Sequence, residues 1–472
     1  MAVTDAALRL LLAGANVALV TASGAALASL AGASRRFRPA ERLGLGYLAG
    51  SAWAGVAAFL VSLGTGAPLV RSLFLPVLAL PLVLLALRRA RLARDRSQVP
   101  VLPPGAAPRL LRGLAVLVGS GVCAVVLLDA VSCVASDFDG RMTWLPLARY
   151  VRQERSVLPS ALTDATWEVS HPRYPPLVPL LLVSAQEVLD VDPLDERFPR
   201  SVHAAFLPAY LLVLSGLARR LAGVRASAVA VVLASTTFAL TFENHGGPMG
   251  SYSDFPLAAF AGAGGVLLLL ARGRDALVGG LLLSAAVLTK NEGAVLALGA
   301  VAVCLAAGLL RRRLTIGARL APALVAAACL VPALAGLSLW KSRIPNRSDE
   351  AYLASGKPLP PAAEVVSRLK GAAPVVAAKT FSPREWGPTT PLVAVLLLLA
   401  PFGPRRPHLR LLLALASLPP LLGLAAYGLH YDPAELARVT WSRLLTQASL
   451  PALVVLALLA REGLVPTRRP SG

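Results

Sequence analysis

The chain has 472 residues, of which 56% are hydrophobic and only 15% are charged, against about 25% in soluble chains. Its mean hydropathy is +0.66, and long uncharged runs recur from end to end, which excludes a set of soluble domains and predicts an all-α polytopic membrane protein. The net charge of +21 comes mostly from arginines at the ends of apolar runs, so membrane orientation explains it better than a nucleic-acid partner does.

Apolar runs along the chain predict about thirteen membrane-spanning helices. Clusters of arginine fall on alternate loops between them if the N-terminus is outside and the C-terminus inside, because cytoplasmic loops carry an excess of Lys and Arg. The predicted spans are 7–31, 43–63, 69–87, 111–134, 202–218, 226–242, 254–271, 275–289, 293–310, 316–340, 389–402, 407–428 and 446–460.

Residues 174–188 are apolar, but they open with Pro175 and Pro176 and are too short to cross alone. Counting them as a span would reverse the side of every later arginine cluster, so they predict an interfacial helix on the outer surface. Residues 461–472 are then a short cytoplasmic tail. The predicted outer loops cover about 136–201, 243–253, 341–388 and 429–445.

Two carboxylates one residue apart, Asp137 and Asp139, follow the fourth span at the membrane surface. A carboxylate in this position can act as general base on an acceptor hydroxyl, or it can hold a divalent cation. An ordinary solvated helix end is the alternative interpretation.

The same loop continues with the segment His171–Pro176, whose three prolines fix the backbone. Arg173 can pair with a phosphate oxygen, and His171 can donate a hydrogen bond to one. A rigid entry into the interfacial helix is the alternative explanation of the prolines.

Ionisable residues also occur in the next outer loop and at the start of the following span. Glu243 and His245 are of the types that bind metals, but the chain has only five histidines and shows no convincing His/Cys set, so no zinc site is predicted. Asp254 begins a span, where a carboxylate is favourable at a helix N-terminus, and simple capping is its expected role.

The segment Lys290–Gly293 lies between two short apolar runs with hardly any loop. Ionisable residues at such depth are costly and indicate function. Lys290 suits an anionic headgroup such as phosphate, whereas mutual neutralisation with Glu292 is the alternative. Arg443, on the outer side before the last span, can bind phosphate or pair with an outer-loop carboxylate.

In this order, the residues resemble the GT-C superfamily of membrane glycosyltransferases, which use polyprenyl-phosphate-linked sugars. The nearest likeness is to the bacterial branch with protein O-mannosyltransferase, aminoarabinose transferase and rhizobial galacturonosyltransferase relatives. The likeness covers about residues 111–460, and residues 1–110 hold three additional helices. The matching segments are Asp137–Asp139 with Trp144, His171–Pro175, Ser253–Leu257, Thr289–Gly293, and Arg443 with Pro451.

The resemblance implies a GT-C-like bundle with a long outer catalytic loop that carries juxtamembrane helices. It implies an inverting transfer from a polyprenyl-phosphate sugar to a hydroxyl of a glycan, lipid or protein, on the extracytoplasmic face of a bacterial inner membrane. Asp139 is then the general base, with Asp137 as second choice. The departing phosphate needs cations as charge builds on it. The candidates that bind it are Lys290, Arg173, Arg443 and His171, and further site candidates are Trp144, Tyr174, Glu243, His245, Asp254, Asn291 and Glu292.

No cofactor is expected, and metal dependence stays open because relatives differ in it. A transporter or flippase for a lipid-linked sugar is the main alternative, since many spans and intramembrane charges suit transport as well. A non-catalytic membrane scaffold is a third hypothesis, and it predicts that Asp139, Lys290 and Arg443 lie far apart.

Overall fold

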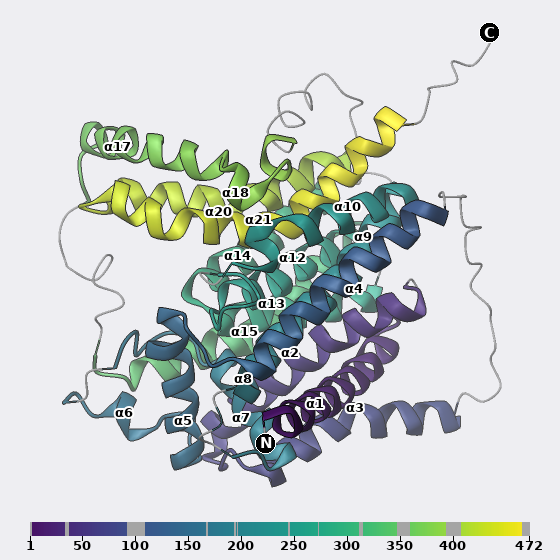
Figure 1. The fold of residues 1–472 in the computed structure, drawn as a ribbon, viewed down its shortest axis with the longest axis vertical. Coiled ribbons are helices and arrows are strands. Elements are labelled where there is room, and N and C mark those ends of the chain that lie inside the picture. The colour runs from purple at the N-terminus through teal and green to yellow at the C-terminus, as the bar shows by residue number, and fades with distance from the viewer. Residues whose placement is uncertain are drawn as a thin grey trace.

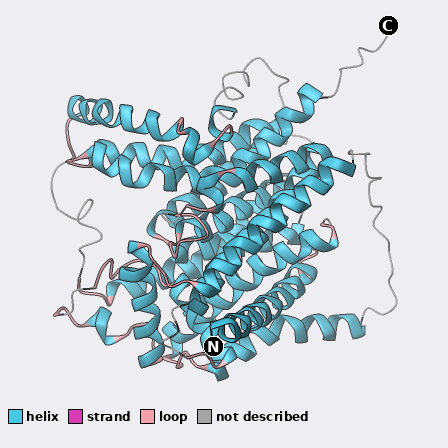
Figure 2. Cartoon of the chain, in the orientation of Figure 1, coloured by secondary structure: helices cyan, strands magenta, loops and turns pink. Residues whose placement is uncertain are grey.

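The described part of the chain consists of helices joined by loops and contains no strand (Figures 1 and 2). Long apolar helices lie side by side in one bundle, as an all-α polytopic membrane protein requires. The computed structural model describes residues 2–33, 37–91, 109–166, 169–192, 195, 197–243, 246–271, 273–310, 315–346, 359–392 and 407–464.

Nine helical segments in these ranges are long and apolar enough to cross a membrane. Each coincides with one of the predicted spans. They are α1 (Ala2–Leu30), α2 (Pro39–Thr65), α3 (Arg71–Arg91), α4 (Arg109–Ser132), the consecutive pair α8 (Arg197–Ala204) and α9 (Phe206–Ala222), α14 (Asn291–Leu310), α15 (Ile316–Ser342), α20 (Pro407–Leu429) and α21 (Pro433–Leu464).

Three further predicted spans form shorter helices, α10 (Val224–Thr236), α12 (Asp254–Leu270) and α13 (Ala276–Thr289). They measure about 20 to 26 Å at 1.5 Å per residue, less than the hydrocarbon core of about 30 Å. Most of α12 and α13 is buried by other helices, so protein surrounds these short elements. The remaining prediction, 389–402, lies outside the described residues beyond position 392.

The segment 174–188 forms α7 (Leu177–Leu189), which is too short to span a membrane, in line with the prediction. Eleven of its thirteen residues are buried, so α7 is an interior element and does not lie with an apolar face in the lipid interface. A glycine in α2 makes this packing possible, because a Cβ on Gly55 would lie 2.3 Å from Leu177 Cδ1.

The predicted outer loops contain more helix than expected. The loop 429–445 shortens to 430–432 because α21 already begins at Pro433, and α17 packs along α20 and α21 around Tyr427 and Trp441 (Figure 1). The helices within the other loops are π-helical η2 (Gly140–Trp144), α5 (Leu145–Glu154), α6 (Ser160–Thr163), α17 (Ala362–Thr380) and α18 (Pro383–Trp386). Two more short elements are α11 (Phe238–Thr241) and the 3-10 turn η3 (Gly273–Asp275).

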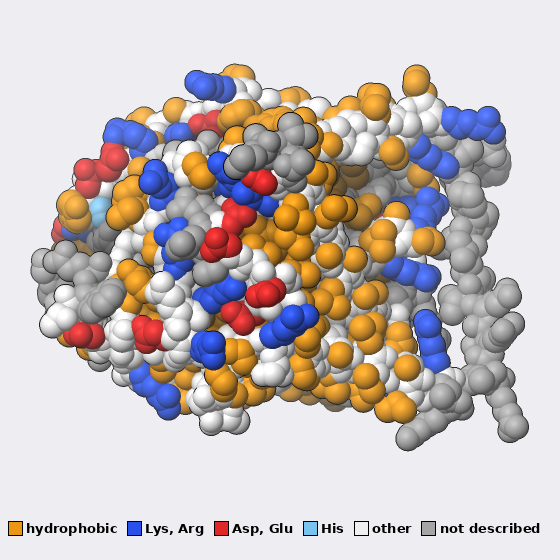
Figure 3. All heavy atoms as spheres, turned by 60° about the horizontal axis from the view of Figure 1, so that its bottom comes forward, with side chains coloured by type: hydrophobic (Ala, Val, Ile, Leu, Met, Phe, Trp, Pro, Cys, Tyr) orange, Lys and Arg blue, Asp and Glu red, His pale blue; other side chains and the backbone are white. Residues whose placement is uncertain are grey.

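The two ends of the bundle differ in charge (Figure 3). Lys and Arg side chains follow one rim, acidic and basic side chains mix at the opposite end, and a hydrophobic belt separates them. Arg88 of α3 donates to the Leu30 carbonyl at the end of α1, and Arg461 of α21 donates to the Leu221 carbonyl of α9. The C-terminal ends of α1 and α3 therefore meet, and so do those of α9 and α21.

Helices α1 and α2 make their closest approach at glycines. A Cβ on Gly24 would lie 1.9 Å from the Gly46 carbonyl oxygen, and one on Gly50 would lie 2.0 Å from the Val20 carbonyl oxygen. Gly46 and Gly50 have the GxxxG spacing that lets membrane helices pack backbone to backbone. Tyr47, between them, donates to the Val202 carbonyl at 3.0 Å, so α2 also joins the core that α8 and α9 build.

Replacing Gly24 by leucine is expected to lower the free energy of unfolding by about 3 kcal/mol, because the new side chain overpacks a backbone contact. Denaturant unfolding in detergent micelles measures the change. Gly14→Leu on the same helix is the control, since a Cβ there meets nothing within 4 Å. Equal stabilities of the two variants would contradict the proposed packing.

Candidate functional site

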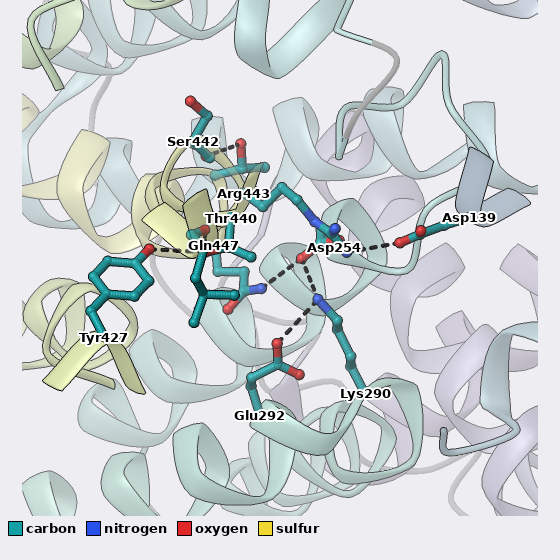
Figure 4. Close-up of polar contacts among 11 residues, drawn as sticks. Asp139, Asp254, Lys290, Glu292, Tyr427, Thr440, Ser442, Arg443 and Gln447 are labelled. Carbon is teal, nitrogen blue, oxygen red and sulfur yellow. Dashed lines mark hydrogen bonds and ion pairs between the residues drawn. The ribbon is translucent and has the colours of Figure 1, made fainter. Parts of the chain in front are cut away.

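Asp254 is the centre of an ion-pair network that joins three helices (Figure 4). Its Oδ1 accepts hydrogen bonds from Lys290 Nζ at 3.0 Å and from Gln447 Nε2 at 2.7 Å. Its Oδ2 accepts one from Arg443 Nε at 2.9 Å, and Arg443 Nη2 lies 2.8 Å from the same oxygen. One carboxylate therefore holds two of the candidates that the sequence analysis selected for phosphate binding, Lys290 and Arg443.

Two further carboxylates extend the network outward. Arg443 Nη2 donates to Asp139 Oδ2 at 3.1 Å, and Lys290 Nζ lies 3.1 Å from Glu292 Oε1. The side chain of Asp254 is 0% exposed, whereas those of Asp139 and Glu292 are 13% and 30% exposed. The network thus runs from a fully buried centre to two carboxylates that a ligand can reach.

Helix ends bring these side chains together. Asp254 is the first residue of α12 and Glu292 the second of α14, where the helix dipoles favour negative charge. Lys290 is extended, with φ −159° and ψ 158°, and connects α13 directly to α14. The tight junction needs Gly293, because a Cβ there would lie 1.8 Å from the Ala286 carbonyl oxygen. The segment Lys290–Gly293 therefore reverses the chain between α13 and α14 without a loop.

The paired carboxylates of the acidic motif have different surroundings. Asp137 is buried, and its two oxygens accept hydrogen bonds from the backbone N–H groups of Gly140 at 2.8 Å and Ser251 at 3.1 Å. Burial raises the pKa of the Asp137 carboxyl above its ordinary value. A Cβ on Gly140 would lie 2.3 Å from Asp137 Oδ2, so this close contact requires glycine. Asp137 fixes the turn that presents Asp139.

Asp139 is the carboxylate of the motif that faces the network. Its Oδ2 pairs with Arg443, and within the described residues no hydrogen bond reaches its Oδ1. That oxygen is therefore available to a ligand hydroxyl, which makes Asp139 the better placed general base of the two.

Aromatic rings line the network. Tyr174 stacks on both Trp144 and His171, with centroid distances of 5.6 and 4.4 Å. The Arg443 guanidinium also lies 4.6 Å above the ring of Tyr252. Burial raises the pKa of Tyr252 to about 12, so its hydroxyl stays protonated at neutral pH.

Four buried polar atoms next to the network have no hydrogen-bond partner within the described part of the chain. Each such atom costs about 1–3 kcal/mol if it stays unpaired. A polar ligand or ordered water that bonds to them removes this cost, so they support a binding site for a polar molecule. They are Trp144 Nε1, Ser251 Oγ, Ser253 Oγ and Gln447 Oε1.

The remaining candidates have other positions. Arg173 is buried and donates to the Lys341 carbonyl at 2.7 Å from Nη2, and Lys341 in turn donates to Asn291 Oδ1 at 2.8 Å. Arg173 and Asn291 thus hold the end of α15 against the outer loop. Glu243 lies half-buried between α11 and α12, and His245 lies outside the described residues. Within those residues, no group of three His, Cys, Asp or Glu side chains could hold a metal ion.

Sequence reasoning missed Gln447 and Tyr252, and it did not anticipate the ion pair of Asp129. The signal for Gln447 was present, because residues four apart share a helix face and Gln447 follows Arg443 by four. Asp129 pairs with Arg200 at 2.7 Å, and Arg200 also donates to the Met249 carbonyl, which ties α4 to the loop before α12. No spacing in the sequence reveals that long-range pair.

Comparisons with protein-family models, with curated proteins and with solved structures find no significant match to this chain. The functional argument therefore depends on the geometry of the site.

The Asp254→Asn variant is expected to lower the free energy of unfolding by about 3–5 kcal/mol, because Lys290 and Arg443 lose the buried charge that pairs with them. Chemical denaturation of the purified protein in detergent measures the loss. Asp190→Asn, at an exposed carboxylate in the outer loop, is the matched control. A stability like that of the control would show that Asp254 does not hold the network together.

Proposed function

We propose that the chain is a membrane glycosyltransferase of GT-C type. It transfers a sugar from a polyprenyl-phosphate donor to a hydroxyl of a glycan, lipid or protein acceptor, with inversion at the anomeric carbon. The observation that carries the proposal is the contact between Asp139 and Arg443, which are 304 positions apart, in the same network as Lys290. A scaffold gives no reason for a general base and two cations to converge.

In the proposed reaction, Asp139 Oδ1 accepts the proton of the acceptor hydroxyl while the hydroxyl oxygen attacks the anomeric carbon. The bond between that carbon and the phosphate oxygen breaks, and its electron pair stays on the phosphate. The products are the new glycoside, polyprenyl phosphate and a protonated Asp139. Charge grows on the leaving phosphate, so preorganised donors lower the barrier.

Arg443 and Lys290 supply those donors even though Asp254 already pairs with both. A guanidinium has five N–H donors and an ammonium has three. Within the described residues, the bonds of Arg443 use Nε and Nη2, and those of Lys290 use two carboxylates. Arg443 Nη1 and the third N–H of Lys290 therefore suit phosphate oxygens. Arg173 and His171 are assigned to shaping the loop, since Arg173 bonds to the Lys341 carbonyl.

The proposed sidedness follows from the charge at the two ends of the bundle. Arg443 of the network lies near the start of α21, whereas Arg461 lies at the opposite end of that helix, next to the arginines in the last turn of α9, and arginine-rich ends face the cytoplasm. The donor and acceptor are accordingly expected at the extracytoplasmic face of a bacterial inner membrane.

Membranes that carry Asp139→Asn are expected to lose about 10²–10⁴-fold in the rate of transfer from labelled polyprenyl-phosphate sugars, the contribution of a general base. The variant protein should accumulate as the parent does, and Asp190→Asn should keep its activity. Full activity of Asp139→Asn would remove Asp139 from the mechanism. Flux of the lipid-linked sugar in proteoliposomes without glycosyl transfer would instead decide for a transporter.

Cysteine labelling tests the sidedness in a chain whose four native cysteines are replaced by alanine. Tyr431→Cys, at a residue 84% exposed beside the start of α21, is expected to react with a membrane-impermeant maleimide in intact cells. Arg89→Cys, on the arginine rim, should react only after permeabilisation. The reverse pattern would place the network at the cytoplasmic face and exclude the proposed reaction.

A further inference from the structure

The loop before α12 carries a buried tyrosine that the proposed reaction does not use. Tyr252 is only 5% exposed. A buried tyrosine places an apolar ring in the protein interior and usually finds a hydrogen-bond partner for its hydroxyl. The ring and the hydroxyl of Tyr252 contact two residues to which the proposed reaction gives different tasks, Arg443 and Asp139.

The ring of Tyr252 supports the guanidinium of Arg443. The Cζ atom of Arg443 lies 4.6 Å from the ring centroid, within the distance of about 6 Å at which a cation is attracted to an aromatic face. The side chain of Arg443 is only 15% exposed, and removal from water strengthens such a contact. The same loop also packs against the stem of Arg443, because a Cβ on Gly246 would lie 3.0 Å from its Cγ.

The hydroxyl of Tyr252 contacts the acidic motif. It accepts a hydrogen bond from the backbone N–H of Asp139. One side chain therefore touches both the backbone of the proposed general base and the cation that pairs with the carboxylate of that base.

The loop that carries Tyr252 is held by residues on either side of it. Arg200 donates to the Met249 carbonyl at 2.8 Å, and the backbone N–H of Ser251 donates to Asp137 Oδ1 at 3.1 Å. Both contacts come from buried side chains. The ring of Tyr252 is thus fixed before a substrate arrives.

The contact between Tyr252 and Arg443 gains importance when Asp139 takes up a proton. In the proposed reaction, the carboxylate of Asp139 becomes neutral while charge grows on the departing phosphate, so its attraction for Arg443 weakens at the moment when the cation is needed. An aromatic ring attracts a cation through its quadrupole, which does not depend on the protonation state of Asp139. The ring and the carboxylate of Asp254 therefore hold Arg443 throughout the step.

We propose that Tyr252 is a positioning residue of this site, which keeps the guanidinium of Arg443 directed at the leaving phosphate while Asp139 changes its protonation state. The inference rests on the proposed glycosyl transfer. Tyr252 acts through Arg443 and needs no contact with the substrate. The departing phosphate carries more charge than the phosphodiester of the donor, so the contact is expected to affect kcat more than KM for the donor.

Fluorinated phenylalanines at position 252 test this role with little change in the shape of the ring. Each ring fluorine withdraws electron density from the aromatic face and weakens its attraction for a cation. The assay uses the purified full-length protein and a labelled polyprenyl-phosphate sugar. Tyr252→Phe loses one neutral hydrogen bond and should keep kcat within about threefold of the parent. Trifluorophenylalanine should lower kcat about tenfold below that of Tyr252→Phe, with one or two fluorines giving intermediate values and KM for the donor changing less than about twofold.

The same series at Tyr210 is the matched control. Tyr210 is also buried, and its hydroxyl bonds to Ser449 Oγ at 2.7 Å, but within the described residues no cation lies over its ring. Fluorination at position 210 should therefore leave kcat at the value of Tyr210→Phe.

The outcomes separate this role from the reaction on which it rests. If the parent transfers sugar and kcat does not depend on fluorination at position 252, the role of Tyr252 is overturned and the reaction stands. Equal losses at positions 252 and 210 would also overturn the role, because they would indicate a general effect of packing. A parent that transfers no sugar would overturn the proposed reaction and, with it, the role of Tyr252.

Discussion

The buried carboxylate of Asp254 is the constraint that holds the ends of α12, α13 and α21 together. A charge with 0% exposure is stable only when cations and hydrogen-bond donors surround it, and here Lys290, Arg443 and Gln447 do so. Asp254 begins α12, Lys290 follows α13, and Arg443 and Gln447 both belong to α21, so the carboxylate fixes how these three helices meet. Asp139 and Glu292 complete the network at its more exposed edge.

Burial and hydrogen bonding also distinguish residues that shape the site from residues that a ligand can contact. Asp137 and Arg173 are both buried and bound to backbone groups, so they determine the path of the outer loop. Near the start of that loop, one carboxylate oxygen of Asp139 accepts no hydrogen bond within the described part of the chain. A charged centre that is neutralised by its own protein stays ordered before a substrate arrives, and such preorganisation is what electrostatic catalysis requires.

Much of the architecture could be predicted from the length of the apolar runs, because nine predicted spans form long apolar helices in the structure. The prediction failed where packing against other helices decides where a segment lies. An apolar 13-residue segment has the same composition in a lipid interface as in a protein interior, so the burial of α7 was not visible. The sequence also singled out Asp139, Lys290 and Arg443, but it could not show that Asp254 joins two of them. The pairing of Asp254 with Arg443 depends on the packing of helix ends that are nearly two hundred residues apart in the sequence.

Helix α21 runs over 32 residues, about 48 Å along its path, with Pro451 in its interior. Near one end it carries Arg443, bound to Asp139 and Asp254, and near the other it carries Arg461, bound to the Leu221 carbonyl of α9. Both ends of α21 are therefore anchored to other elements, one through buried ion pairs and the other through a backbone carbonyl.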